Sequence, residues 1–168
     1  DSEEGFEAYE INISCPNVKD EGMAFGSNPK VTEQIVHGIR ERTKRPIIPK
    51  LTPNVTYLPG IARVCEDAGA DAIALINTIV GMSVDIESRK PRLATITGGY
   101  SGPPIKPVAL AKVFEAHKAV SIPIIGIGGI TKVTDVIEFM ITGASTVQVG
   151  TANFVNPLTT VEFIDSLY

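Results

Sequence analysis

The feature that most constrains the fold is a regular alternation of short apolar runs with longer amphipathic runs. The short runs have the length of buried β-strands and lie at 9–14, 46–51, 71–77, 122–127 and 145–149. The longer runs predict helices over 29–44, 58–68, 105–119, 133–141 and from 160 onward. Five strand–helix units in succession predict parallel strands joined by right-handed crossovers.

Two architectures are compatible with this alternation. The strands are apolar on both faces, which is typical of a sheet covered by helices. Such a sheet forms either a (β/α) barrel or an open doubly wound fold. Five units are too few to close an eight-stranded barrel, so a barrel reading implies about three further units. A partial barrel of five units would also leave two open strand edges in this chain.

The composition limits which ligands and which kinds of catalytic site the chain is expected to have. The net charge is −4, which gives no electrostatic reason to bind nucleic acid or an anionic membrane. No apolar stretch reaches the roughly 18 residues that a membrane span needs. The two cysteines, Cys15 and Cys65, favour reduced thiols in a cytoplasmic enzyme over a disulfide scaffold. No acidic or histidine cluster has metal-ligand spacing, and no serine has a histidine nearby, so neither a metal site nor a nucleophilic triad is predicted.

Residues with chemical capacity follow each predicted strand directly. They are Ser14, Cys15 and Asn17 after the first strand, Lys50, Thr52 and Asn54 at the second, Asn77 and Thr78 at the third, Gly128 and Gly129 after the fourth, and Gly150 and Thr151 after the fifth. The carboxyl ends of parallel strands meet at one edge, where ligands bind in such folds. We therefore expect one shared site at this edge.

Two glycine-containing loops suggest a phosphate site. The segments 125–130 (IGIGGI) and 149–154 (VGTANF) each join a strand to a helix start. Glycine permits close approach of the backbone to a ligand, and a helix N-terminus offers free N–H groups to an anion. The alternative is a pair of tight turns, but the pairing in the last two units favours phosphate binding. GIGG lacks the full spacing of the dinucleotide fingerprint.

Three kinds of side chain complete the expected site. Lys50, near the end of a buried strand, is interpreted as a cation that stabilises negative charge on a cofactor, or else as a lysine that reaches solvent. Cys15 is a candidate for general acid–base catalysis, since a cysteine thiol has a pKa of about 8.5. Cys65 falls on the apolar face of a helix and is expected to be a buried hydrophobe. The amides of Asn12, Asn17 and Asn77 suit a ring with alternating carbonyl and N–H groups, such as a pyrimidine.

Six segments, taken together, resemble class 1 dihydroorotate dehydrogenases. They are EINISCPNVKDEGMAFG (10–26), KLTPNVT (50–56), INTIVGM (76–82), GGYSGPPIKPVAL (98–110), IPIIGIGGI (122–130) and GASTVQVGTANF (143–154). The segment from Gly81 to Asp85 and the GGYSGPPIKP motif are most similar to the NAD-linked type B catalytic subunit, with fumarate-linked members next. The flavin domain of dihydropyrimidine dehydrogenase is also similar, which leaves that activity as an alternative.

The resemblance implies a (β/α)8 TIM-barrel fold that binds FMN, of which residues 1–168 form a C-terminal portion: an incomplete barrel of about five β/α units. It implies oxidation of dihydroorotate to orotate in de novo pyrimidine biosynthesis. It also implies a homodimer and, in the NAD-linked type, a second subunit that carries FAD and an iron–sulfur cluster.

The resemblance also implies roles for individual residues. Cys15 would be the base that removes the C5 proton of dihydroorotate while a hydride passes from C6 to flavin N5, and Lys50 would be the second catalytic residue. Substrate contacts would come from Asn12, Asn17, Asn77 and Thr78. Contacts to FMN would come from Lys50, Gly102, Gly128, Gly129, Gly150 and Thr151.

Two other interpretations remain at this point. The chain could be an inactive fragment or partial barrel that requires further chain to function. It could also be another phosphate-binding barrel, such as an isomerase or aldolase, in which Lys50 would form a Schiff base.

Overall fold

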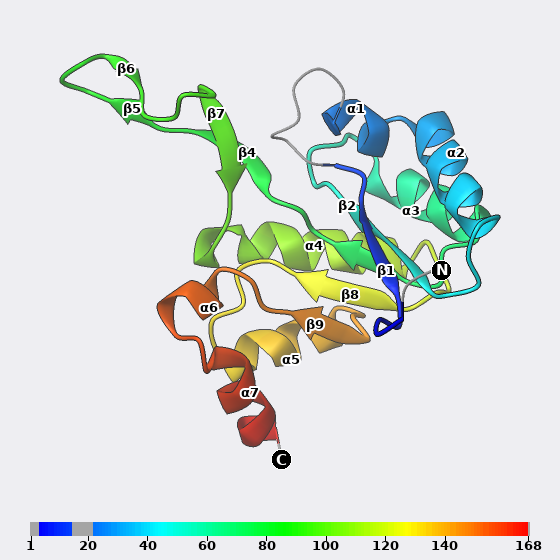
Figure 1. Cartoon of the computed structure of the whole chain (residues 1–168). Helices are drawn as coiled ribbons and strands as arrows, with labels where there is room; N and C mark the ends of the chain where they lie inside the picture. Colours follow the sequence, from blue (N-terminus) through cyan, green and yellow to red (C-terminus); the bar gives the residue numbers. More distant parts are fainter. Residues whose placement is uncertain (1–3, 15–21, 168) are drawn as a thin grey trace.

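A single curved parallel sheet organises the chain in a computed structural model that describes residues 4–14 and 22–167 (Figure 1). Its strands are β1 (Tyr9–Asn12), β2 (Ile47–Leu51), β3 (Ile73–Leu75), β8 (Ile124–Ile127) and β9 (Thr146–Gln148). Their order in the sheet is β1-β2-β3-β8-β9, and every neighbouring pair is parallel. Each strand therefore lies beside the one before it in the chain. A barrel has this uninterrupted order, whereas a doubly wound sheet reverses direction at a switch point.

The main helices form a layer that follows the sheet. They are α2 (Pro29–Arg40), α3 (Leu58–Asp67), α4 (Lys106–His117), α5 (Val133–Ile141) and α7 (Thr159–Leu167). Each helix in this series packs against the next. Figure 1 shows the series running from α2 and α3 at the right, past α4, to α5 and α7 at the bottom. The described residues thus form five β/α units of a barrel, with β1 and β9 as its two sheet edges.

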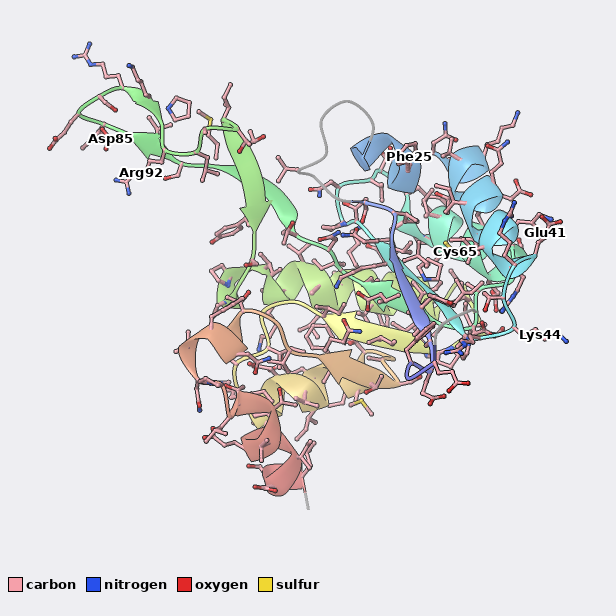
Figure 2. The ribbon with its side chains drawn as sticks, viewed as in Figure 1. Phe25, Glu41, Lys44, Cys65, Asp85 and Arg92 are labelled. Atoms are coloured by element: carbon pink, nitrogen blue, oxygen red, sulfur yellow. The ribbon has the colours of Figure 1, made fainter. Side chains whose placement is uncertain are left out.

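Alternate strand residues divide the sheet into an apolar face and a polar face. On the helix side, Leu51, Ile73 and Leu75 are buried in the main core. Phe139 of α5 is completely buried in the same core. So is Cys65 of α3, which is labelled in Figure 2. The opposite face of the sheet carries long polar side chains on β1, β2 and β9, which is where the barrel interior would lie.

All five strands and five main helices expected from the sequence are present, with shifted ends. The helix expected over 29–44 stops at Arg40, whose Nη2 donates to the carbonyl oxygens of Thr43 (2.8 Å) and Arg45 (2.7 Å). These bonds hold the turn that leads into β2. A 3₁₀ turn, η1 (Pro103–Ile105), precedes α4. Two short helices were not predicted, namely α1 (Gly22–Ser27) and α6 (Ala152–Val155).

The long connection after β3 contains strands that the sequence did not reveal. β4 (Ile79–Met82) pairs antiparallel with β7 (Thr97–Tyr100), and β5 (Val84–Asp85) pairs with β6 (Lys90–Pro91) near the tip. Figures 1 and 2 show this hairpin extending away from the sheet, with Asp85 and Arg92 near its far end. Its strands are short and rich in glycine, so the sequence signal for pairing is weak.

Both histidines lie on helices. His37 is an exposed residue of α2, with its Nε2 atom 3.6 Å from Glu41. His117 ends α4 and packs closely over Gly143, where an added Cβ would lie 2.3 Å from the ring. Among the described residues, no helix is long and apolar enough to cross a membrane.

Candidate functional site

A cavity at the carboxyl edge of the sheet collects most of the predicted site residues. All six expected cofactor-binding residues line it, as do Asn77 and Thr78. The cavity encloses 240 Å³. Pockets for cofactor-sized ligands are about 300–1,000 Å³, so the described residues form part of a site of that size. The residues come from β2 and from the segments that follow β3, β7, β8 and β9. The predicted convergence on one edge is therefore confirmed for the described residues.

The loop after β8 is shaped by two glycines with positive φ angles. Gly128 has φ 129° and Gly129 has φ 75°. A Cβ on Gly129 would lie 2.8 Å from the backbone nitrogen of Lys106 and 3.0 Å from the carbonyl oxygen of Gly102. A side chain at residue 129 would therefore collide with the backbone at the start of α4, and the loop needs glycine to pass this close.

Replacing Gly129 with alanine is expected to lower the free energy of unfolding by about 2 kcal/mol or more, because the new Cβ is strained both by φ and by contact with backbone atoms. Gly38→Ala in α2 is the matched control. Its nearest neighbour is the end of Arg42 at 3.7 Å, so it is expected to raise stability by about 0.5–1 kcal/mol. Denaturant unfolding of the two variants and the wild type measures both changes in the free energy of unfolding. Equal effects of the two substitutions would contradict this account.

Four backbone amides at the cavity are available to an anion. Among the described residues, the N–H groups of Gly128, Gly129, Gly150 and Thr151 donate no hydrogen bond to one another or to other groups. These amides belong to the two glycine loops that the sequence singled out. They are the donors that could bind a phosphate group.

Two backbone N–H groups just before α5 already have an acidic partner from the helix itself. Asp135 Oδ2 accepts hydrogen bonds from the backbone N–H groups of Thr131 (2.8 Å) and Lys132 (3.1 Å). An acidic residue of the helix itself thus occupies the anion position at the N-terminus. The amides of Thr131 and Lys132 are therefore not available to a phosphate.

Asp135 is also part of a buried ion pair behind that loop. Its side chain is 2% exposed, and its Oδ1 lies 2.7 Å from Lys106 Nζ at the start of α4. Burial alone would raise the pKa of Asp135, but the hydrogen bonds from Lys106, Thr131 and Lys132 outweigh it and lower the pKa below its usual range. The hydrogen bonds from Lys106 to Asp135 and Glu138 raise the pKa of Lys106. The pair ties the start of α5 to the start of α4 on either side of the glycine loop.

A cluster of amides and a hydroxyl lies beside the cavity, where β1 ends. Asn77 Nδ2 donates to Asn12 Oδ1 (3.1 Å) and to Ser14 Oγ (3.1 Å). Ser14 Oγ donates in turn to the carbonyl oxygen of Lys50 (3.1 Å). These bonds place the expected substrate residues Asn12 and Asn77 in contact. Cys15 and Asn17, the other two expected residues in this region, lie outside the described residues.

Asn54 connects the end of β2 with the start of the hairpin. Its Nδ2 donates to the carbonyl oxygen of Thr78 (3.0 Å), and its Oδ1 accepts from the backbone N–H of Val80 (3.1 Å). Thr52 Oγ1 accepts from the Asn54 side chain at 2.9 Å. The polar residues that follow β2 therefore hold the backbone of Thr78 at the cavity.

Several cavity residues were missed by the sequence analysis. They are Ile76, Ser101, Ile105, Ile127, Ile130, Thr131, Gln148, Ala152 and Phe154. Two of them extend the polar lining. Ser101 Oγ accepts a hydrogen bond from Thr151 Oγ1 at 3.0 Å. The sequence could have indicated Gln148, because it is a long polar residue between two valines and lies two positions before Gly150, a predicted cofactor residue.

Lys50 in the cavity wall forms an ion pair with a carboxylate. Its Nζ lies 3.0 Å from Glu10 Oε1, and Gln148 Nε2 donates to Glu10 Oε2 at 2.6 Å. Glu10 is on β1 and Gln148 is on β9, so the carboxylate joins residues from the two edges of the curved sheet. The side chain of Lys50 is therefore held against a carboxylate in the cavity wall.

The donor set fits a phosphorylated, polar cofactor such as the FMN that the resemblance implies. The ammonium of Lys50, the hydroxyls of Ser101 and Thr151, and the free loop amides all suit an anionic or carbonyl-bearing ligand. Within residues 4–14 and 22–167, no group of three histidine, cysteine, aspartate or glutamate side chains is placed to hold a metal ion. The cavity is therefore suited to an organic cofactor with a phosphate.

Comparison with known proteins gives the same family throughout. The family model described as dihydroorotate dehydrogenase matches residues 3–168. The chain is 55% identical over 158 residues to the catalytic subunit of dihydroorotate dehydrogenase B (NAD(+)) of Pelobacter propionicus, covering 94% of this chain and 52% of that protein. It is 57% identical over 148 residues to the corresponding subunit of Geobacter metallireducens, covering 88% of this chain and 48% of that protein.

A solved structure supports the fold. The dihydroorotate dehydrogenase of Eimeria tenella, crystallised with ferulenol, matches with a TM-score of 0.79 over 96% of this chain and 49% of that one, at 24% identity. At this identity the match concerns the fold alone. The chain spans about half the length of the curated relatives that it matches.

Proposed function

Because this chain belongs to the dihydroorotate dehydrogenase family, we propose that it is the C-terminal, flavin-binding portion of a class 1 enzyme that oxidises dihydroorotate to orotate. The observation that carries the proposal is the cavity at the carboxyl edge of the sheet. It brings together an ammonium group and two glycine loops with free amides, and it lies beside the amide cluster of Asn12 and Asn77. The cofactor proposed for it is FMN.

The cofactor contacts are proposed from the positions of the donors. The amides of Gly128, Gly129, Gly150 and Thr151 would bind the phosphate, because they have no other partner among the described residues. Lys50 would lie near the flavin ring, where its charge stabilises negative charge that builds up during reduction. Gly102, whose carbonyl oxygen lies close to Gly129, would contribute backbone atoms to the same cofactor site.

The substrate would bind beside the amide cluster. Asn12, Asn77 and Thr78, together with Asn17, would hydrogen-bond the carbonyl and N–H groups of the pyrimidine ring. Cys15 follows Ser14 directly in the chain and would take the proton from C5. A bound flavin supplies the acceptor for the hydride that leaves C6. The chain's own residues therefore bind and orient the substrate and move one proton.

The relatives suggest the physiological setting. The relatives from Pelobacter propionicus, Geobacter metallireducens and Bacteroides thetaiotaomicron are called catalytic subunits of an NAD(+)-linked enzyme, a name that implies a further subunit in those proteins. We propose that this protein is likewise a catalytic subunit, that it is cytoplasmic, and that it forms a homodimer that associates with a second subunit carrying FAD and an iron–sulfur cluster.

Flavin content and reduction test the proposed function. The full-length protein is expected to purify yellow, to contain one FMN per chain, and to lose its flavin absorbance when dihydroorotate is added without oxygen. Dihydrouracil serves as the matched control, because it lacks the carboxylate and reports the related dihydropyrimidine activity. A protein that stays colourless after FMN is added, or that is reduced only by dihydrouracil, would overturn the proposal.

A further inference from the structure

The interior face of the sheet holds a carboxylate directly behind the proposed flavin site. Glu10 lies on β1 and pairs in register with Ile48, while Lys50 pairs with Asn12, two residues closer to the carboxyl edge. Residues two apart on a strand share one face, so Glu10 and Lys50 lie diagonally on the same face. Lys50 and Gln148 line the cavity, whereas Glu10 contacts both of them without lining it.

Both carboxylate oxygens of Glu10 are used by cavity residues. Oε1 is 3.0 Å from the ammonium of Lys50, and Oε2 accepts from the side-chain amide of Gln148 at 2.6 Å. A carboxylate only accepts hydrogen bonds, so it selects the NH₂ end of the Gln148 amide. The side chains of Glu10 and Lys50 are 32% and 22% exposed, which leaves their attraction only partly screened. Glu10 thus fixes the position of the Lys50 charge and compensates it.

We propose that Glu10 is a positioning residue that limits how strongly Lys50 stabilises reduced flavin, an inference that rests on the proposed function. A flavin ring that has taken up a hydride carries a negative charge, and a nearby cation favours that form. A carboxylate bound to the cation reduces this preference. Removing the carboxylate while keeping the cation is therefore expected to make the bound flavin easier to reduce.

The experiment is the reduction potential of bound flavin in Glu10→Gln, measured without oxygen against a reference dye. Glutamine keeps the size of the side chain and removes its charge. We expect the ratio of affinities for reduced and oxidised FMN to rise at least 10-fold, which corresponds to about 30 mV more positive for a two-electron couple. Glu115→Gln is the matched control, since it removes a carboxylate 2.9 Å from Lys112 on the outer side of α4. It is expected to leave the potential unchanged.

A double-mutant cycle with Lys50→Met separates positioning from a direct effect of the Glu10 charge. The shift caused by Glu10→Gln is expected to fall to less than half when Lys50 is absent. Flavin bound by the double variant but not by Glu10→Gln alone would also support the inference, because the uncompensated ammonium would then be the cause. Equal shifts in both backgrounds, no shift, or loss of flavin from both variants would overturn it. A wild-type protein without flavin would instead overturn the proposed function, and this inference with it.

Discussion

Replacing Cys15 with alanine in the full-length protein is expected to slow reduction of the bound flavin by dihydroorotate about 100-fold or more, while flavin content stays the same. The expected loss is that of a general base, whose positioned proton transfer contributes about 10²–10⁴-fold. Cys15 follows Ser14, which hydrogen-bonds to Asn77 beside the cavity. Stopped-flow absorbance of the flavin under anaerobic conditions measures the rate.

The other cysteine is the matched control for this experiment. Cys65 is completely buried in α3, and burial raises the pKa of its thiol to about 12. It therefore has almost no thiolate at neutral pH. Cys65→Ala is expected to leave the reduction rate unchanged and to destabilise the protein by about 1 kcal/mol. Wild-type reduction rates in Cys15→Ala would remove Cys15 from the mechanism.

Replacing Asp135 with asparagine is expected to lower the free energy of unfolding at pH 7 by about 3 kcal/mol, because it leaves the start of α5 and the Lys106 ammonium without their buried carboxylate. That is a large part of the roughly 5–15 kcal/mol by which domains are stable. Denaturant unfolding of the two proteins measures the difference. A loss below about 1 kcal/mol would contradict the role assigned to this pair.

The pH dependence of that difference has a definite sign. The pKa of Asp135 is lowered in the folded protein, so its contribution is complete above the ordinary aspartate pKa of about 3.9 and is lost as the pH falls through the folded pKa. The pKa of Lys106 is raised, so its contribution persists below about 10.4 and is lost as the pH rises through the folded pKa. The stability gap between wild type and Asp135→Asn is therefore expected to be constant near neutral pH and to shrink in acid.

Glu138→Gln is the control that tests whether burial of the carboxylate matters. Its carboxylate lies 2.8 Å from the same Lys106 ammonium, but its side chain is 45% exposed. Exposed ion pairs contribute about 0–1 kcal/mol, so Glu138→Gln is expected to have a small effect that added salt reduces further. Losses of equal size in Glu138→Gln and Asp135→Asn would show that charge alone, and not the buried bonds to the start of α5, accounts for the stability.

Local patterns in the chain were sufficient to identify the sheet and its functional edge. Lys50, Asn77 and Gly129 were each predicted at the site because they stand at the end of an apolar run. Strand position converts directly into spatial position when all strands are parallel. The hairpin formed by β4 and β7 was missed, since its glycine-rich strands are stabilised by pairing with each other and have little apolar alternation.

By itself the sequence determined the alternation of strands and helices, the edge at which the cavity lies and the residues proposed to bind phosphate. Those properties depend on short-range periodicity and on the conformational freedom of glycine. Only the tertiary structure decided that Asp135 pairs with Lys106, 29 positions away, and that Glu10 contacts Gln148, 138 positions away in the chain. Such contacts depend on the curvature of the sheet and the packing of helices, which bring polar groups together at distances that no local pattern encodes.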